Sequence, residues 1–566
     1  MTDSLLAPAP EATESYTPEE VRRYYVGGDW QHRVLFEVLR DHAAAQPDAV
    51  FVTDDTLTLS YGELAEQAVR LAAGLRRLGV ERGDRVAVQM PNWSEFATIT
   101  AAISRLGAVL VPIMPIMRHD EVGYTVSHSG AKVVIGPEHH HKFDYATMYR
   151  EVLERSATPF EIVIARSAAG RAGTGILPLE SLYAEGPLAE LDAALGPAAS
   201  PDELALVVYT SGTTARPKGC MHTFNTLHAC AVGMIRRMRT DQNDVFFNPS
   251  PVCHSTGLVT GLVMPLLIGA STHFMPEWNP EDGLRRIAQY RCTTTFTSTT
   301  FLTTLMQAYD ASRHDMSSMR YWVCAGAPIP GAVVQHARTT FPACNVLSLY
   351  GRSENMTTVM CAPDDPVERS VTSDGRALEG ASVIVVDRDG LEVPRGEAGD
   401  IAYRGPSHML GYFRDPQNTA ELYTPDGYSR SGDLGTMDEA GFVRVQGRVK
   451  DIIIRGGINI SAREVEDLLI THEAVQDAAV VAMPDARLGE RACAFVILRP
   501  GATAPTLTEL TDFLRGKQIA VQKLPERLEI VEEFPMTPVG KVRKNVLRER
   551  IAAILEAERA GVSAGA

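Results

Sequence analysis

The sequence predicts an α/β protein with a large N-terminal domain and a small α+β C-terminal domain. Helical and strand patterns alternate up to about Ser348, which is typical of layered α/β subdomains with a largely parallel sheet. From about Val383, short strands separated by turns indicate a small β-rich subdomain. A second mixed pattern begins at Gly447. The expected organisation is an N-terminal tail (1–30), a large domain (31–449) and a C-terminal domain (450–566).

The first helix of the large domain has a cap and an apolar stripe. Ser60 and Glu63 have the spacing of a capping box, and apolar residues recur at helical spacing from Leu64 to Leu78. Short apolar runs predict strands, and longer periodic segments predict helices. The expected strands are 85–90, 108–112 and 133–136, and the expected helices are 96–106, 224–238 and 258–267.

The pattern of predicted secondary structure changes twice in the last third of the chain. The β-rich subdomain is expected to contain strands at 383–387, 399–404 and 441–446. The C-terminal domain is expected to contain helices at 462–471 and near 507–519, with strands around 478–481 and 492–498.

Composition excludes several classes of protein. The 566 residues carry a formal net charge of −16, which argues against a general nucleic-acid or anionic-membrane surface. Eight scattered cysteines without a Cys-x-x-Cys pair fit a reducing compartment. No apolar run approaches the roughly 20 residues of a membrane helix, and Met1 to Thr17 lacks the regions of an export signal. We expect a cytoplasmic protein with a frayed N-terminus.

The stretch Tyr209-Thr-Ser-Gly-Thr-Thr-Ala-Arg-Pro-Lys-Gly219 follows a predicted buried strand at 204–208. It combines two glycines, four hydroxyl residues and one lysine, which suit an anion-binding turn because backbone N–H groups, hydroxyls and an ammonium can all donate to phosphate. A polar surface loop is the alternative. The Gly-Lys-Ser/Thr order of a Walker A loop is absent. The candidate phosphate-binding residues are Thr210, Ser211, Gly212, Thr213, Thr214 and Lys218.

This loop is similar to the phosphate loop of the adenylate-forming superfamily, which includes acyl- and aryl-CoA ligases, peptide-synthetase adenylation domains and luciferases. That family usually has glycine at the position of Ala215. The resemblance covers roughly residues 45 to 548. Its other motifs are Gly326-Ala-Pro328, Tyr350-Gly-Arg-Ser-Glu354, Ser431-Gly-Asp433, Gly447-Arg448 and Pro535-Met-Thr-Pro-Val-Gly-Lys541.

The resemblance implies a nucleotide site. Tyr350 would pack on adenine, Ser353 would meet the α-phosphate, and Glu354 would bind magnesium. Asp433 and Arg448 would bind the ribose. The remaining nucleotide-binding positions that it implies are Gly326, Ala327, Pro328 and Gly351.

The resemblance also implies catalytic, hinge and substrate positions. Lys541 would bridge the carboxylate and the α-phosphate during adenylation, with Lys218 and Glu354 as the other catalytic residues. Lys450 occupies the hinge about which the small, mobile domain rotates. The acyl pocket would include His254, Ala325 and Gly326, although a purely structural role for His254 is an equal alternative.

The expected function is ATP- and magnesium-dependent activation of a carboxylic acid to an acyl-adenylate, followed by transfer to CoA. Transfer to a separate carrier protein stays open, as does a homo-oligomer. One alternative is adenylation for another acceptor or oxyanion, such as nitrite activation for diazotisation of an aryl amine. Another is a catalytically silent nucleotide-binding sensor, against which the presence of Lys541 argues. The expected partner is a small-molecule acid or oxyanion, with no nucleic acid and no membrane.

Three consecutive histidines, His139 to His141, raise the question of a metal site. Adjacent residues do not share a helix face, and the sequence places no carboxylate or cysteine partner beside them. A solvated loop is the favoured interpretation, and a metal site is the alternative.

Overall fold

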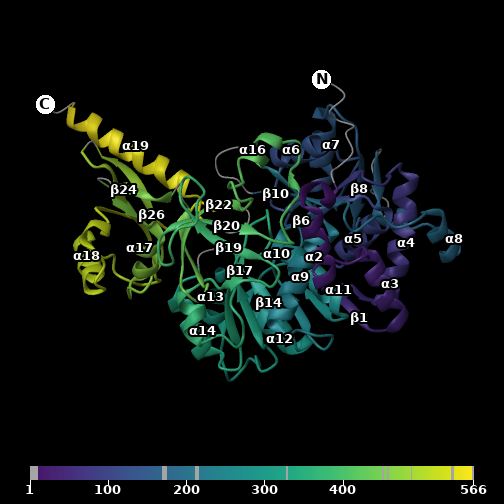
Figure 1. The fold of residues 1–566 in the computed structure, drawn as a ribbon, viewed down its shortest axis with the longest axis horizontal. Helices are drawn as coiled ribbons and strands as arrows, with labels where there is room; N and C mark the ends of the chain where they lie inside the picture. Colours follow the sequence, from purple (N-terminus) through teal and green to yellow (C-terminus); the bar gives the residue numbers. More distant parts are fainter. Residues whose placement is uncertain are drawn as a thin grey trace.

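The computed structural model describes residues 11–167, 175–210, 216–326, 329–448, 451–455, 458–485, 487–536 and 541–563. The structure contains two large sheets whose strands interleave along the chain, a small antiparallel sheet and a C-terminal α+β unit (Figure 1). The C-terminal unit, with α17 (Ala462–Leu469), α18 (Leu507–Gly516) and α19 (Lys544–Ser563), lies at the opposite side of the molecule from α4 (Tyr61–Arg77) and α8 (Leu188–Ala194). This confirms the predicted fold class.

The first large sheet has eight strands, of which the central ones are parallel. Strands β11 and β21 add to one edge in antiparallel fashion. The strand order is β21 (Gly411–Tyr412), β11 (Gly219–Thr223), β10 (Leu204–Tyr209), β4 (Val109–Pro112), β3 (Arg85–Val88), β5 (Val133–Pro137), β8 (Glu161–Ala165) and β9 (Ile176–Pro178).

The second large sheet has nine strands with a parallel centre and antiparallel edges. Its order is β18 (Arg376–Ala377), β17 (Val359–Met360), β16 (Asn345–Tyr350), β15 (Tyr321–Cys324), β14 (Thr294–Thr297), β12 (Val245–Asn248), β13 (Ser271–Phe274), β1 (Val50–Thr53) and β2 (Thr58–Ser60).

Helices cover these sheets and form the main core with them. The predicted capping box is present: the Ser60 side chain accepts from the Glu63 N–H at the start of α4, and α4 buries its apolar stripe. The large-domain helices are α3 (Leu35–Ala45), α4 (Tyr61–Arg77), α5 (Glu95–Leu106), α6 (His119–Ser129), α7 (Tyr145–Arg155), α8 (Leu188–Ala194), α9 (Phe224–Met238), α12 (Pro280–Tyr290), α13 (Thr299–Ala308), α14 (Gly331–Thr340), α15 (Val367–Thr372) and α16 (Pro416–Ala420).

The predicted apolar helix at 258–267 is interrupted by a π-helical turn. It consists of α10 (Ser255–Leu258), the π-helix Val259–Val263 and α11 (Met264–Ile268). A Cβ at Gly261 would lie 2.2 Å from the Asn248 amide nitrogen, so this glycine permits the close approach of the helix to β12.

The predicted β-rich subdomain is present as a four-stranded antiparallel sheet, and its strand β22 (Ser429–Met437) was not among the predicted ones. Its order is β19 (Ser382–Val386), β20 (Gly399–Arg404), β22 (Ser429–Met437) and β23 (Val443–Arg448). The C-terminal sheet contains β25 (Ile458–Ile460), β24 (Ile453–Arg455), β27 (Gly489–Leu498) and β26 (Val475–Asp485), and β28 (Arg527–Ile530) pairs with β27. The predicted boundaries at 449 and 450 lie outside the described residues.

The expected N-terminal tail is folded over much of its length, which corrects that prediction. Helix α2 (Pro18–Gly27) begins with a capping box at Thr17, and Tyr24 and Trp30 are buried. Trp30 donates from its indole nitrogen to the Pro406 carbonyl, 3.0 Å away. Burial of aromatic surface therefore holds this segment on the large domain.

Two features that the composition raised, the state of the cysteines and the length of the apolar helices, can be examined in the structure. All eight cysteines are buried free thiols. Within the described part of the chain, no helix is both long and apolar enough to cross a membrane.

Candidate functional site

The predicted phosphate loop follows β10 and precedes β11 of the first large sheet. Two hydrogen bonds join Thr210 and Lys218, which flank it. The Thr210 N–H donates to the Lys218 carbonyl at 2.9 Å, and the Lys218 N–H donates to the Thr210 hydroxyl at 3.2 Å. The predicted residues Ser211, Gly212, Thr213 and Thr214 lie outside the described residues. Lys218 is thus placed at the base of the loop.

The Lys218 side chain is linked to Glu354 through Tyr412. Its ammonium lies 4.8 Å from the centre of the Tyr412 ring and donates to Asn418 Oδ1 at 2.5 Å. The Tyr412 hydroxyl donates to Glu354 Oε1 at 2.6 Å. A carboxylate oxygen is the ligand type that magnesium prefers, so Glu354 fits a magnesium ion that is also bound by phosphate.

The segment Tyr350 to Glu354 leaves the end of β16 and is held tightly. A Cβ at Gly351 would lie 1.9 Å from the Met356 carbonyl oxygen, so only glycine allows this close approach. Arg352 donates to the Ser429 and Arg430 carbonyls, at 2.9 and 2.6 Å. These bonds fix the segment against β22.

His222 supports the same segment from β11. Its Nε2–H donates to the Ser353 carbonyl at 2.8 Å, and its Nδ1 lies 3.1 Å from the Thr226 hydroxyl. The ring is fully buried. His222 is therefore a positioning residue for Ser353.

Asp433, Arg448 and Tyr350 form a second cluster. Asp433 and Arg448 are cross-strand partners in β22 and β23, with Asp433 Oδ1 3.5 Å from Arg448 Nε. The Tyr350 hydroxyl donates to Asp433 Oδ2 at 2.5 Å. Burial raises the pKa of the Asp433 carboxyl, and Arg448 opposes this shift.

A cavity lies where these segments meet. The predicted substrate-pocket residues His254, Ala325 and Gly326 line it together with Gly351, Ser353 and Lys541. The His254 ring accepts the Thr256 N–H at the start of α10, at 3.3 Å from Nδ1. Burial, reinforced by Lys541, lowers the pKa of His254 to about 4, so its imidazole is neutral at pH 7. It is suited to shaping the pocket.

Lys541 reaches this cavity from the C-terminal domain. Met536 and Val542, which lie on either side of it in the sequence, form an antiparallel bridge. Burial and then Arg448 lower the pKa of the Lys541 ammonium, whereas Asp433 and Glu354 act in the opposite direction. The lysine is thus electrostatically coupled to both clusters of the large domain.

The remaining site predictions can be placed only in part. Ala327, Pro328 and the hinge residue Lys450 lie outside the described residues. Sequence reasoning missed Tyr412, Asn418 and His222, and it assigned no role to Arg352. Tyr412 and Asn418 follow no motif that the sequence analysis used, and His222 looks like an ordinary strand residue.

Comparison with known proteins identifies the family. The family model described as "AMP-binding enzyme" matches residues 39–413, and the model of the AMP-binding enzyme C-terminal domain matches residues 464–541. The chain belongs to the AMP-binding enzyme family. This AMP-binding enzyme is an adenylate-forming, AMP-forming ligase that uses ATP, as the sequence resemblance predicted.

Relatives of this AMP-binding enzyme extend over nearly its whole length. It is 34% identical over 550 residues to medium-chain fatty-acid–CoA ligase from Escherichia coli (strain K12), covering 96% of this chain and 94% of that one. It is 33% identical to 2,3-dihydroxybenzoate-AMP ligase from Bacillus subtilis (strain 168), covering 95% and 98%. The ATP-bound structure of MatB from Rhodopseudomonas palustris has a TM-score of 0.81 at 28% identity, covering 93% and 100%.

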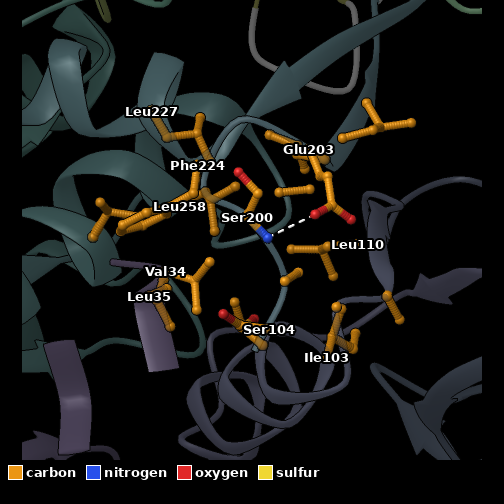
Figure 2. A pocket seen from close by; sticks show the side chains of 18 residues that line it. Val34, Leu35, Ile103, Ser104, Leu110, Ser200, Glu203, Phe224, Leu227 and Leu258 are labelled. Carbon is orange, nitrogen blue, oxygen red and sulfur yellow. Dashed lines mark hydrogen bonds between the residues drawn. The ribbon is translucent and has the colours of Figure 1, made fainter. Parts of the chain in front are cut away.

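A second cavity has a different character (Figure 2). It lies among α3, α5, α9 and the start of β10, and is lined mainly by apolar side chains such as Leu35, Ile103 and Leu227. Its one charged lining residue among those described, Glu203, accepts the Ser200 N–H at 2.7 Å. No cation lines it among the described residues, so it lacks the groups that bind phosphates.

Lowering the pH from 7 to 5 is expected to destabilise the native state through His222. Burial lowers the pKa of this imidazole to about 4, whereas the unfolded chain has the ordinary value of about 6.5. The unfolded state therefore binds the proton first, and stability is lost as the pH falls from about 6.5 towards 4. This one residue accounts for about 2 kcal/mol between pH 7 and pH 5.

Urea unfolding at both pH values measures this effect. Glutamine at position 222 keeps an N–H donor for Ser353 and does not titrate, so His222→Gln should lose about 2 kcal/mol less than wild type on acidification. His336→Gln, at an exposed position of α14, is the matched control and should behave like wild type. Equal pH dependence of wild type and His222→Gln would show that His222 is not the group responsible.

Proposed function

We propose that the enzyme activates a carboxylic acid as an acyl-adenylate and transfers the acyl group to the thiol of CoA. The observation that carries the proposal is that Lys541 of the C-terminal domain lines the same cavity as His254 and Ser353. A lysine at that position supplies positive charge between a bound carboxylate and the α-phosphate of ATP. Bringing two anions together demands such charge, because positioning and electrostatic stabilisation dominate phosphoryl-group chemistry.

In the first step, a carboxylate oxygen attacks the α-phosphorus of ATP and pyrophosphate leaves. We assign Lys218 and the loop after β10 to the phosphates, Tyr350 to the adenine, and Asp433 and Arg448 to the ribose. Magnesium, held by Glu354, would neutralise phosphate charge when bound. In the second step, the CoA sulfur attacks the acyl carbon and AMP leaves.

The C-terminal domain is proposed to rotate about Lys450 between the two steps. Lys541 serves adenylation only, and it occupies the cavity through which the acyl group is reached. Moving the loop that carries Lys541 would give a thiol access to the acyl carbon. Hinge motions of this kind require only a few residues to change their backbone dihedral angles.

The cavity lining favours an acid with an apolar or aromatic body and no second charge. Met114, Met117 and Leu349 contribute apolar walls. Arg352 and Lys541 are the two cationic lining residues among those described, and Arg352 is occupied by backbone carbonyls. A second carboxylate on the substrate would therefore lack a partner, which costs free energy in a buried pocket.

A substrate screen tests this proposal. Pyrophosphate release is measured with aromatic, medium-chain and dicarboxylic acids, and with nitrite plus an aryl amine, each with and without CoA. We expect release with apolar or aromatic monoacids and thioester formation when CoA is present. Pyrophosphate release that occurs with nitrite and an aryl amine but with none of the carboxylic acids would favour diazotisation. Release that depends on a carboxylic acid but yields no thioester in the presence of CoA would favour another acceptor.

A further inference from the structure

Two histidines and one glutamate form a cluster that the adenylation chemistry does not use. His140 and His141 belong to the hairpin of β6 (His139–His140) and β7 (Phe143–Asp144). Glu277 lies between β13 and α12. One potential ligand atom from each of the three residues lies within 4.8 Å of the other two. None of the three lines the cavity that contains Lys541.

The backbone of the hairpin brings the two imidazoles to the same side. Neighbouring residues of a regular strand point to opposite faces. Here His141 and Lys142 have φ values of 48° and 66°, in the left-handed region that two-residue hairpin turns usually fill with asparagine and glycine. The centres of the His140 and His141 rings consequently lie 4.0 Å apart. A left-handed conformation costs free energy in a histidine, and such strain is often found at binding sites.

The distances suit a small metal ion. His141 Nδ1 lies 3.4 Å from Glu277 Oε1. Two ligands of a tetrahedral zinc ion, each bonded at about 2.1 Å, are separated by about 3.4 Å. His141 and Glu277 are exposed, so water can complete the coordination.

Neighbouring contacts hold both sides of the cluster. Trp278, next to Glu277, donates from its indole nitrogen to the Thr304 hydroxyl at 3.0 Å and packs on Phe301. On the hairpin side, the Arg118 guanidinium lies 4.0 Å from the centre of the Phe143 ring, and Trp93 contacts the His140 ring edge-on. A bound ion would therefore join two anchored segments.

We propose that His140, His141 and Glu277 bind a divalent transition metal ion such as Zn²⁺. Two imidazoles and one carboxylate favour such an ion over Mg²⁺ or Ca²⁺, which prefer oxygen ligands. The hairpin follows β5 of the eight-stranded sheet, and Glu277 follows β13 of the nine-stranded sheet. The ion cross-links loops of the two sheets and stabilises their arrangement.

Calorimetric titration of the untagged, chelator-treated protein with ZnCl₂, without nucleotide, tests the proposal. Wild type should bind one equivalent of zinc, whereas His140→Ala, His141→Ala and Glu277→Gln should each bind at least about tenfold more weakly. His139→Ala is the matched control, because His139 belongs to the same hairpin but lies 4.0 Å from Asp144 instead. It should bind zinc like wild type, and Mg²⁺ should not bind at this cluster.

Two further readouts separate a built site from scattered binding at surface histidines. Saturating zinc should raise the Tm of wild type and His139→Ala, but not that of the three ligand variants, because an ion that binds only the native state stabilises it. Co²⁺ should give visible absorption bands in the same two proteins only. Equal zinc affinity in His140→Ala and His139→Ala, or no stoichiometric zinc binding by wild type, would overturn the proposal.

Discussion

Replacing Lys541 by alanine is expected to slow acyl-adenylate formation by about 10²–10³-fold, the usual effect of removing one preorganised donor to developing negative charge. Lys541 lines the cavity and is coupled to Glu354 and Asp433. In the proposed mechanism its charge is needed while pyrophosphate leaves, but not when a thiol displaces AMP. Thioester formation from a supplied synthetic acyl-adenylate should therefore stay within a few-fold of wild type, as measured by separate assays of the two half-reactions.

Lys523→Ala provides the control for the Lys541 variant. Lys523 belongs to the same C-terminal domain and pairs with Glu464 on its surface. Its removal should change neither half-reaction. If Lys541→Ala lost both half-reactions equally, the lysine would have a structural role or would act in both steps.

The variant Glu354→Gln is expected to lose roughly 10²–10³-fold in adenylation rate, since metal assistance contributes several kcal/mol to such reactions. An amide oxygen is a poorer ligand for a hard cation than a carboxylate. Glutamine can still accept the hydrogen bond from Tyr412, so folding should be retained. The rate should also need more magnesium to reach half its maximum.

Rates measured over a range of magnesium concentrations test this expectation, and thermal unfolding monitors the fold. Glu368→Gln, at an exposed position of α15, is the matched control and should leave the magnesium dependence unchanged. An unaltered magnesium dependence in Glu354→Gln would remove Glu354 from the metal site.

The sequence predicted elements best where local rules decide them. The capping box at Ser60 and the apolar stripe of α4 depend on spacing alone, and both were predicted correctly. The segment 18–30 was wrongly taken as tail, because the burial of Tyr24 and Trp30 depends on residues that are distant in the sequence, such as Pro406. The π-helical turn at Val259 escaped prediction because it follows from packing of Gly261 against Asn248.

The candidate site shows the same difference between features set by neighbouring residues and features set by distant ones. Motifs suggested roles for Lys218, Glu354 and Asp433, because each motif carries its chemistry within a few residues, and these roles stay predictions. Partners contributed by other elements could not be found in this way. Tyr412 contacts Glu354 across 58 positions of sequence, and His222 contacts Ser353 across 131. Glu277, the carboxylate of the histidine cluster, is also far from His141 in the sequence, and its proximity became visible only in the structure.

The most direct test of the account follows the oxygen atoms of the acid. A single turnover is run with an accepted acid whose carboxylate is labelled with ¹⁸O, together with ATP, magnesium and CoA, and the products are analysed by mass spectrometry. Attack of the carboxylate on the α-phosphorus predicts one ¹⁸O in AMP and one in the acyl-CoA thioester. Label in pyrophosphate, or AMP without label, would contradict the acyl-adenylate mechanism, and labelled AMP without thioester would contradict transfer to CoA.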